Sequence, residues 1–213
     1  TVDLIGHGLS QVSGSSDKID QSVHYIAEML KEEGSEKAHF IGVSLGGLII
    51  QQFNDLYPEK VKSLTVVGGY DIHQSSEQIA EEQKKTKVGA LIRSIFSMKA
   101  FRRHAAGLST YTTEGNIQFY SASSRYTRKS FLVMSGLNKI ANFKPIAPVT
   151  TPHLIMVGGH DIELALDIAY EWHESLPNSE FVQVSGAGHC VNLDHPQQFN
   201  TVLQNFLINI GNN

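Results

Sequence analysis

Ser44 is the residue whose surroundings most suggest covalent chemistry. It lies between Gly42 and Gly46 in a Gly-x-Ser-x-Gly pattern, after an apolar run at 38–43 and directly before a helical pattern. A sharp strand-to-helix turn would raise its hydroxyl above the sheet, and both glycines would be needed because side chains have no room there. The Leu45 N–H, at the start of the helix, would then donate to a developing oxyanion. A glycine-rich turn with an incidental serine is the alternative.

A serine nucleophile requires a base to remove its proton and a carboxylate to orient that base. Asp161 follows an apolar run at 153–157, and His189 follows another at 181–184. Loops at the carboxyl ends of parallel strands converge on one crevice. We therefore expect Ser44, Asp161 and His189 at one edge of the same sheet, as nucleophile, acid and base.

Other interpretations of these residues stay open. Asp71 is the alternative acid, because it follows the preceding strand-like run. A metal site built from His160, Asp161 and His189 is conceivable, but no metal-binding spacing supports it, and we expect no metal or organic cofactor. Cys190 follows the histidine and is expected to be a packing residue rather than a second nucleophile.

The elements that must position these residues alternate between strand-like and helical patterns. Strand-like runs are expected at 2–5, 38–43, 61–67, 153–157 and 181–184, and helices at 17–34, 48–57, 162–175 and 196–210. Residues 71–148 are mostly helical in pattern. This order predicts an α/β fold with a mostly parallel sheet, in which a helical insertion at 71–148 separates two core parts, 1–70 and 149–213.

The composition is that of a soluble globular chain and excludes several classes of protein. Of the 213 residues, 41% are apolar and 18% charged, which is too apolar for a disordered chain. The net charge of −4 gives no reason to expect a nucleic-acid partner, and the single cysteine rules out an intrachain disulfide. No run approaches the ~18 apolar residues of a membrane span. A cytoplasmic protein is expected, with a secreted protein whose leader has been removed as the alternative.

Charge is distributed unevenly between the expected insertion and the rest of the chain. Residues 71–148 carry a net charge of +7, and the remainder carries −11. One explanation is mutual attraction of insertion and core; the others are a basic lid over a pocket for anionic substrates and attraction to a membrane surface. Arg102, Arg103, Arg125 and Arg128 are candidate anion contacts, each more often solvated than functional in such a position.

Four segments of the sequence together resemble the α/β-hydrolase superfamily, of the lidded esterase, lactonase and C–C hydrolase type. They are Asp-x-x-Gly-His-Gly-x-Ser at 3–10, Gly-Val-Ser-Leu-Gly-Gly at 42–47, Gly-Gly-His-Asp at 158–161, and Gly-Ala-Gly-His at 186–189 with Asp-His-Pro at 194–196. The segments follow the family's order and span nearly the whole chain.

The resemblance implies roles for particular residues. Ser44 would be the nucleophile, His189 the general base and then acid, and Asp161 the residue that orients His189. The implied reaction is hydrolysis of a small carboxylic ester, thioester or lactone through an acyl-enzyme, on a small-molecule substrate. C–C bond hydrolysis by the same triad, or ligand binding without turnover, are the alternatives. Residues 71–148 would be the lid, and His7 would hold its own loop.

The resemblance also implies elements that lie before Thr1. The family's earlier strands, and the loop that supplies a second oxyanion donor, would precede this residue. In the family's strand order one of those strands lies between the strands that match 2–5 and 38–43. We therefore expect a gap in the middle of the sheet, which an upstream segment of the full protein would fill. A native mass that matches 213 residues would contradict this.

Overall fold

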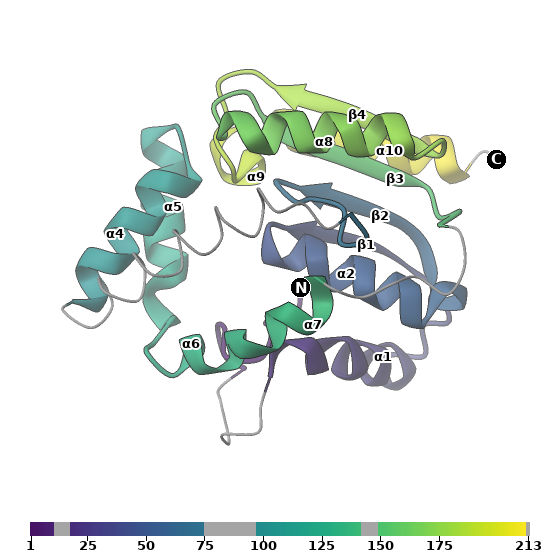
Figure 1. Cartoon of the computed structure of the whole chain (residues 1–213), viewed down its shortest axis with the longest axis horizontal. Coiled ribbons are helices and arrows are strands. Elements are labelled where there is room, and N and C mark those ends of the chain that lie inside the picture. Colours follow the sequence, from purple (N-terminus) through teal and green to yellow (C-terminus); the bar gives the residue numbers. More distant parts are fainter. Residues whose placement is uncertain (11–17, 75–96, 142–148, 212–213) are drawn as a thin grey trace.

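Four parallel strands form one sheet in this computed structural model, which describes residues 1–10, 18–74, 97–141 and 149–211. The strands are β1 (Ala38–Val43), β2 (Val61–Val67), β3 (His153–Gly158) and β4 (Ser179–Val184), and they lie side by side in that order. Each neighbouring pair is parallel. The carboxyl ends of all four strands therefore lie at one edge of the sheet (Figure 1).

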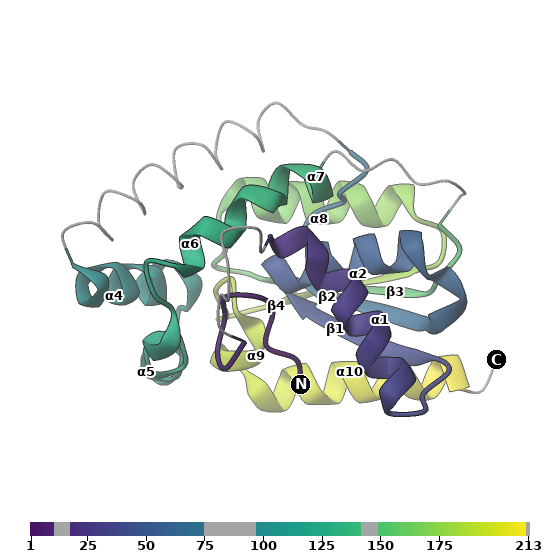
Figure 2. The ribbon, with the colours of Figure 1, turned by 90° about the horizontal axis from the view of Figure 1, so that it is seen from below.

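Helices cover both faces of this sheet (Figure 2). Before and between the first strands lie η1 (Ile19–Gln21), α1 (Ser22–Glu32), α2 (Leu45–Leu56) and η2 (Pro58–Lys60). Between β2 and β3 lie α4 (Met98–Ser109), α5 (Thr113–Ala122), η3 (Ser123–Arg125), α6 (Ser130–Val133), η4 (Met134–Gly136) and α7 (Leu137–Ala141). The last part of the chain forms α8 (Glu163–Ser175), α9 (Val191–Asp194) and α10 (Pro196–Gly211).

The central strands are buried on both faces, which explains their nearly continuous apolar sequence. In β3, Ile155 and Val157 join the cluster that includes residues of α2 and α8, whereas Leu154 and Met156 join the cluster that contains Phe206 of α10. Each of these four side chains is 1% exposed or less. The two cores fix the sheet from both sides, so the loops at its carboxyl edge start from rigid positions.

Most of the predicted elements are confirmed. β1 and β2 cover the predicted ranges, while β3 and β4 are each slightly longer than predicted. The helix expected at 48–57 begins earlier, at Leu45, directly after the serine turn, and Pro58 follows its end as predicted. The α/β fold with a parallel sheet is thus confirmed.

The strand expected at 2–5 is wrong. Residues 1–4 have no regular structure, and a turn follows them. Local hydrogen bonds hold this segment and the turn after it instead: the Leu9 N–H donates to Asp3 Oδ2 at 2.7 Å, and the His7 N–H donates to the Leu4 carbonyl at 2.8 Å. No described strand pairs with residues 2–5. The described sheet runs from β1 to β4 without interruption, so the expected gap is not seen within it.

The helices between β2 and β3 occupy part of the range expected for the insertion. Figure 1 shows α4 and α5 beyond the carboxyl ends of the strands, and α6 and α7 nearer to α1 and α2. Phe101, Tyr126 and Phe131 pack together with ring centroids 5.1–5.8 Å apart. The rest of the expected insertion, residues 75–96 and 142–148, lies outside the described residues.

In the described parts of the chain, no helix is both long and apolar enough to cross a bilayer.

Candidate active site

Ser44 lies in a strained turn between β1 and α2. Its backbone φ is +52°, and among the described residues it is the only non-glycine residue with a positive φ. Such a conformation costs energy for any residue with a Cβ and clusters at functional sites. The Ser44 N–H donates to the Val67 carbonyl at 2.7 Å, which ties the turn to the end of β2. The serine is therefore held at the carboxyl edge of the sheet.

The space around the glycines of this turn agrees with the expectation only in part. A Cβ at Gly42 would overlap the backbone of Gly46 and Gly47, so a side chain there is excluded, as predicted. A Cβ at Gly46 would meet no described residue outside its own helix within 4 Å, so the crowding predicted for Gly46 is not found in the described part of the chain. Gly47 is the crowded position instead, because a Cβ there would lie 2.7 Å from Val66 Cγ1. The first turn of α2 packs directly on β2 at this glycine.

His189 and Asp161 meet at the same edge, after β4 and β3 respectively. His189 Nδ1 and Asp161 Oδ2 are 2.7 Å apart, and because a carboxylate only accepts, the imidazole donates through Nδ1. The Asp161 side chain is 5% exposed and that of His189 is 25% exposed. The Ile162 N–H donates to the other oxygen, Asp161 Oδ1, at 2.8 Å, which fixes the carboxylate. The pair is thus buried on its acid side and open on its imidazole side.

Ser44 and His189 both lie beside the turn that ends β2. A Cβ at Gly68 would lie 2.9 Å from His189 Nδ1, and Ser44 is hydrogen-bonded to Val67, the residue before Gly68. Among the described residues, no hydrogen bond joins Ser44 Oγ to His189 Nε2. Catalytic hydrogen bonds are often long without substrate and tighten when it binds. The arrangement has the parts for nucleophilic catalysis: a strained serine, an imidazole oriented through Nδ1, and a helix N-terminus at Leu45.

The comparisons with known proteins agree with this architecture. A model of the family described as "alpha/beta hydrolase fold" matches residues 1–196. This chain belongs to the α/β-hydrolase fold family.

Two sequence relatives of this α/β hydrolase are enzymes with different named reactions. The pimeloyl-[acyl-carrier protein] methyl ester esterase of Aeromonas hydrophila is 24% identical over 97% of this chain and 83% of its own length. The 2-hydroxy-6-oxononadienedioate/2-hydroxy-6-oxononatrienedioate hydrolase of Paraburkholderia phymatum is 26% identical over 97% of this chain and 75% of its own length. Both relatives are hydrolases, which supports hydrolase activity for this chain.

A solved structure shows the same fold. A thermophilic esterase from Thermogutta terrifontis superposes with a TM-score of 0.78 over 98% of this chain and 78% of its own length, at 17% identity.

Asp71, the alternative acid, pairs with a different histidine of the α/β hydrolase. His73 Nδ1 lies 2.9 Å from Asp71 Oδ1, and His73 Nε2 lies 2.7 Å from Asp55 Oδ2. Burial of the imidazole opposes its charge, but the two hydrogen bonds and the two carboxylate charges outweigh this and raise the pKa of His73 to about 9. Asp71 therefore belongs to a separate cluster that contains His73, which the sequence analysis did not single out.

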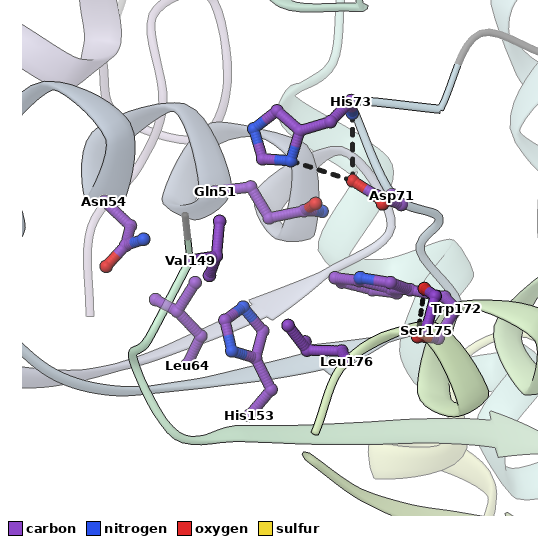
Figure 3. Close-up of a pocket in the computed structure, with 10 residues that line it drawn as sticks. All are labelled: Gln51, Asn54, Leu64, Asp71, His73, Val149, His153, Trp172, Ser175 and Leu176. Carbon is purple, nitrogen blue, oxygen red and sulfur yellow. Dashed lines mark hydrogen bonds and ion pairs between the residues drawn. The ribbon is translucent and has the colours of Figure 1, made fainter. Parts of the chain in front are cut away.

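This cluster borders a small cavity of about 70 Å³ between α2 and α8. Figure 3 shows His73 and Asp71 on one side of it and His153 on another. The His153 side chain is buried, which lowers its pKa, and its Nδ1 bonds the Thr151 carbonyl at 2.7 Å. Neither His73 nor His153 takes part in the arrangement around Ser44.

The remaining candidates have mainly structural contacts. Cys190 is buried, and burial followed by the charges of Asp194 and Asp161 raises the pKa of its thiol to about 12, so it is no thiolate nucleophile at neutral pH. His7 Nδ1 bonds the Ile5 carbonyl at 3.1 Å within its own loop. Within the described ranges, no cluster of three or more His, Cys, Asp or Glu side chains is arranged to hold a metal.

Among the arginines, Arg102 has a definite backbone partner. Its Nη2 donates to the Tyr126 carbonyl at 2.7 Å, which links α4 to the segment after η3. Burial raises the pKa of Tyr126 to about 12. Arg103, Arg125 and Arg128 are exposed. Arg102 is thus partly engaged in holding these helices together.

One acidic residue near the site was missed by the sequence analysis. Asp194 accepts hydrogen bonds from both the loop of His189 and the start of α5. It stands in the Asp-His-Pro segment quoted for the family resemblance, but nothing in the sequence links it to residues 111 and 112. His160, considered above only as part of a metal site, lies with its ring against the ring of Tyr111.

Proposed function

We propose that this protein is a serine hydrolase that cleaves a small carboxylic ester, thioester or lactone through an acyl-enzyme on Ser44. The observation that carries the proposal is the 2.7 Å hydrogen bond between His189 and Asp161, at the sheet edge where Ser44 occupies its strained turn. A relative named as a methyl ester esterase supports an ester as the scissile group.

The first half of the proposed reaction forms the acyl-enzyme. Ser44 Oγ attacks the carbonyl carbon of the substrate while its proton passes to His189 Nε2, and Asp161 stabilises the resulting imidazolium. Leu45 is the first residue of α2, so its N–H has no acceptor within the helix and donates to the oxyanion instead. The second hydrogen-bond donor, which the family resemblance predicts upstream of Thr1, would bind the same oxyanion.

The loss of the leaving group completes the acyl-enzyme: the bond to the leaving oxygen or sulfur breaks, and His189 gives its proton to the alcohol or thiol. The second half of the reaction releases the acid. A water molecule then loses a proton to His189 and attacks the acyl carbon. The acid departs as the proton returns to Ser44 Oγ, so the enzyme is regenerated without metal or organic cofactor.

We further propose that residues 71–148 act as a lid that sets substrate choice. The position of α4 and α5 beyond the carboxyl ends of the strands supports this (Figure 1). The net charge of +7 in residues 71–148 favours substrates with a free carboxylate. The relative named as a dienedioate hydrolase, whose named substrates are dicarboxylates, agrees with this charge.

The first experiment is labelling by a fluorophosphonate probe, which reacts only with activated serines. Wild type should be labelled on Ser44, and Ser44→Ala should lose the label. The matched control is Ser124→Ala, which removes an exposed serine of η3 and should be labelled like wild type. Absence of labelling in wild type, or persistent labelling in Ser44→Ala, would contradict the proposal.

A substrate panel separates ester hydrolysis from the second candidate, hydrolytic C–C cleavage, which the dienedioate hydrolase relative favours. The panel pairs a neutral and an anionic ester of equal size with a 2-hydroxy-6-oxo-dienoate. Faster turnover of the esters supports our proposal, and faster turnover of the dienoate supports C–C cleavage. The anionic ester should have the higher kcat/KM at low salt only, because salt screens the attraction.

A further inference from the structure

The Asp194 carboxylate joins two segments about eighty residues apart. It accepts hydrogen bonds from the Tyr111 N–H at 2.8 Å, the Thr112 N–H at 2.8 Å and the Thr112 hydroxyl at 2.7 Å. It also accepts from the Gly188 N–H at 2.8 Å. Residues 109–112, here called the α4–α5 turn, are thereby fixed to the loop that carries His189.

The backbone on both sides of His189 is held by this assembly. On one side, the Gly188 N–H donates to Asp194. On the other, the Cys190 N–H donates to the Ser109 carbonyl at 2.7 Å. Because Ser109 belongs to the α4–α5 turn and Asp194 binds that same turn, a shift of the turn moves the supports of His189 on both sides.

The α4–α5 turn also touches the residue next to Asp161. The rings of Tyr111 and His160 stack with centroids 3.7 Å apart and an angle of 3° between their planes. His160 directly precedes Asp161, and its N–H donates to the Ala187 carbonyl at 2.8 Å. Tyr111 is 58% exposed, so its main defined side-chain contact is this stack rather than a buried core.

We propose that Asp194 and Tyr111 are positioning residues that couple the α4–α5 turn to the alignment of His189 with Asp161. This inference rests on the proposed function for its effect on catalysis. Small displacements of a catalytic group cost up to about a hundredfold in rate, because the reactive geometry is narrow. The helices beyond the sheet edge would in this way set the geometry of the base as well as cover the substrate.

The ionised form of Asp194 is the one that fits this role. Burial would raise the pKa of the carboxyl, but the hydrogen bonds from Tyr111, Thr112 and Gly188 outweigh burial and lower it. The carboxylate uses both oxygens as acceptors. An amide in its place has only one acceptor oxygen and would direct its NH₂ group at N–H donors.

The test compares Tyr111→Ala with Tyr25→Ala, the same truncation at a tyrosine that is 51% exposed on α1, outside the proposed lid. For an ester substrate, Tyr111→Ala should lower kcat about tenfold, with KM unchanged and the acid limb of the pH profile moved. Tyr111→Phe keeps the stacking ring and should restore kcat, and Tyr25→Ala should behave as wild type. A change in KM alone would indicate substrate contact and would overturn the inference.

Asp194→Asn should have the larger effect, about a hundredfold in kcat, because both sides of the His189 loop lose support. The second readout is the NMR signal of the proton on His189 Nδ1, which depends on its bond to Asp161 and needs no turnover. Tyr111→Ala and Asp194→Asn should shift or broaden it, and Tyr25→Ala should not. If both kcat and this signal stay unchanged, the inference is overturned while the proposed function stands. If wild type does not hydrolyse esters but the signal changes, the proposed function fails and the coupling stands.

Discussion

His189 and His73 form the same short contact with a carboxylate, yet the two sites differ in what remains free. Each histidine lies 2.7 Å from an aspartate oxygen. His189 has one carboxylate partner and a side chain that is 25% exposed, so Nε2 is left to exchange a proton. His73 has a carboxylate at each nitrogen and a side chain that is 17% exposed.

The difference teaches that a histidine–aspartate pair is not by itself a catalytic feature. With both nitrogens bound, the protonated form of His73 is stabilised, and the pKa rises to about 9, so the ring stays charged at neutral pH and cannot act as a base. A general base requires an open nitrogen beside the group it deprotonates. We propose that His189 meets this condition at the sheet edge, whereas both nitrogens of His73 face carboxylates.

The largest expected effect comes from replacing each of the two histidines in turn and comparing the losses in kcat/KM. His189→Ala should lower kcat/KM by about 10,000-fold or more, because the base for Ser44 is lost. His73→Gln should change kcat/KM of the folded protein by no more than about twofold, because it lies outside the proposed mechanism. Steady-state hydrolysis of an activated ester, normalised to the folded fraction by circular dichroism, measures both. Equal losses in the two variants would break the comparison.

Replacing the aspartate partners of the two histidines, Asp161 and Asp71, should give the same contrast in kcat, with smaller losses. Asp161→Asn should lower kcat by about 1,000-fold, because the amide no longer stabilises the imidazolium of His189. Asp71→Asn should leave kcat nearly unchanged, since its carboxylate bonds His73. The same ester assay decides, and a severe loss in Asp71→Asn with a mild loss in Asp161→Asn would identify Asp71 as the acid.

The smallest expected effect concerns stability at alkaline pH. The pKa of His73 is raised from 6.5 to about 9 by folding, so its stabilisation is complete below pH 6.5 and is lost as pH rises through 9. After allowance for solvent screening, the loss should be about 2 kcal/mol in the free energy of unfolding. Urea unfolding at pH 6.5 and 9.5 measures it.

The matched control for this titration is His73→Gln. The variant should be less stable than wild type at pH 6.5, and the difference should shrink by pH 9.5. The buried Cys190, whose pKa folding also raises, destabilises both proteins equally at alkaline pH and cancels in the comparison. A constant difference between the two proteins at both pH values would show that His73 is not charged in the folded state.

Much of the fold could be predicted from the sequence because its signals are local. The four strands β1–β4 each contain a short run rich in apolar residues, and the helices that follow them have helical spacing and clear ends, such as Pro58 after α2. The run at 2–5 has the same kind of apolar pattern, but a strand also requires a neighbouring strand, and here a turn with Gly6 and Gly8 at positive φ follows the segment instead. Whether a short apolar run pairs as a strand depends on residues elsewhere in the chain, so the four residues alone do not indicate it.

The candidate site, like the fold, could be predicted from the sequence only in part. The positions of Ser44, Asp161 and His189 after parallel strands predict a common edge, and the structure brings Asp161 and His189 into contact there. Their catalytic roles stay predictions. The sequence could not indicate that Gly47 rather than Gly46 is crowded, because the obstacle is Val66 on another strand.

From the sequence alone one could predict the order of β1–β4 and the helices between them, the serine turn, and a common sheet edge for Ser44, Asp161 and His189. These follow from periodicity and turn residues that are neighbours in the chain. Only the tertiary structure decided that Asp194 binds Tyr111 and Thr112, and that His73 lies between Asp55 and Asp71. Such contacts join residues far apart in sequence, and they form only where the packing of whole elements brings donors and acceptors within hydrogen-bond distance.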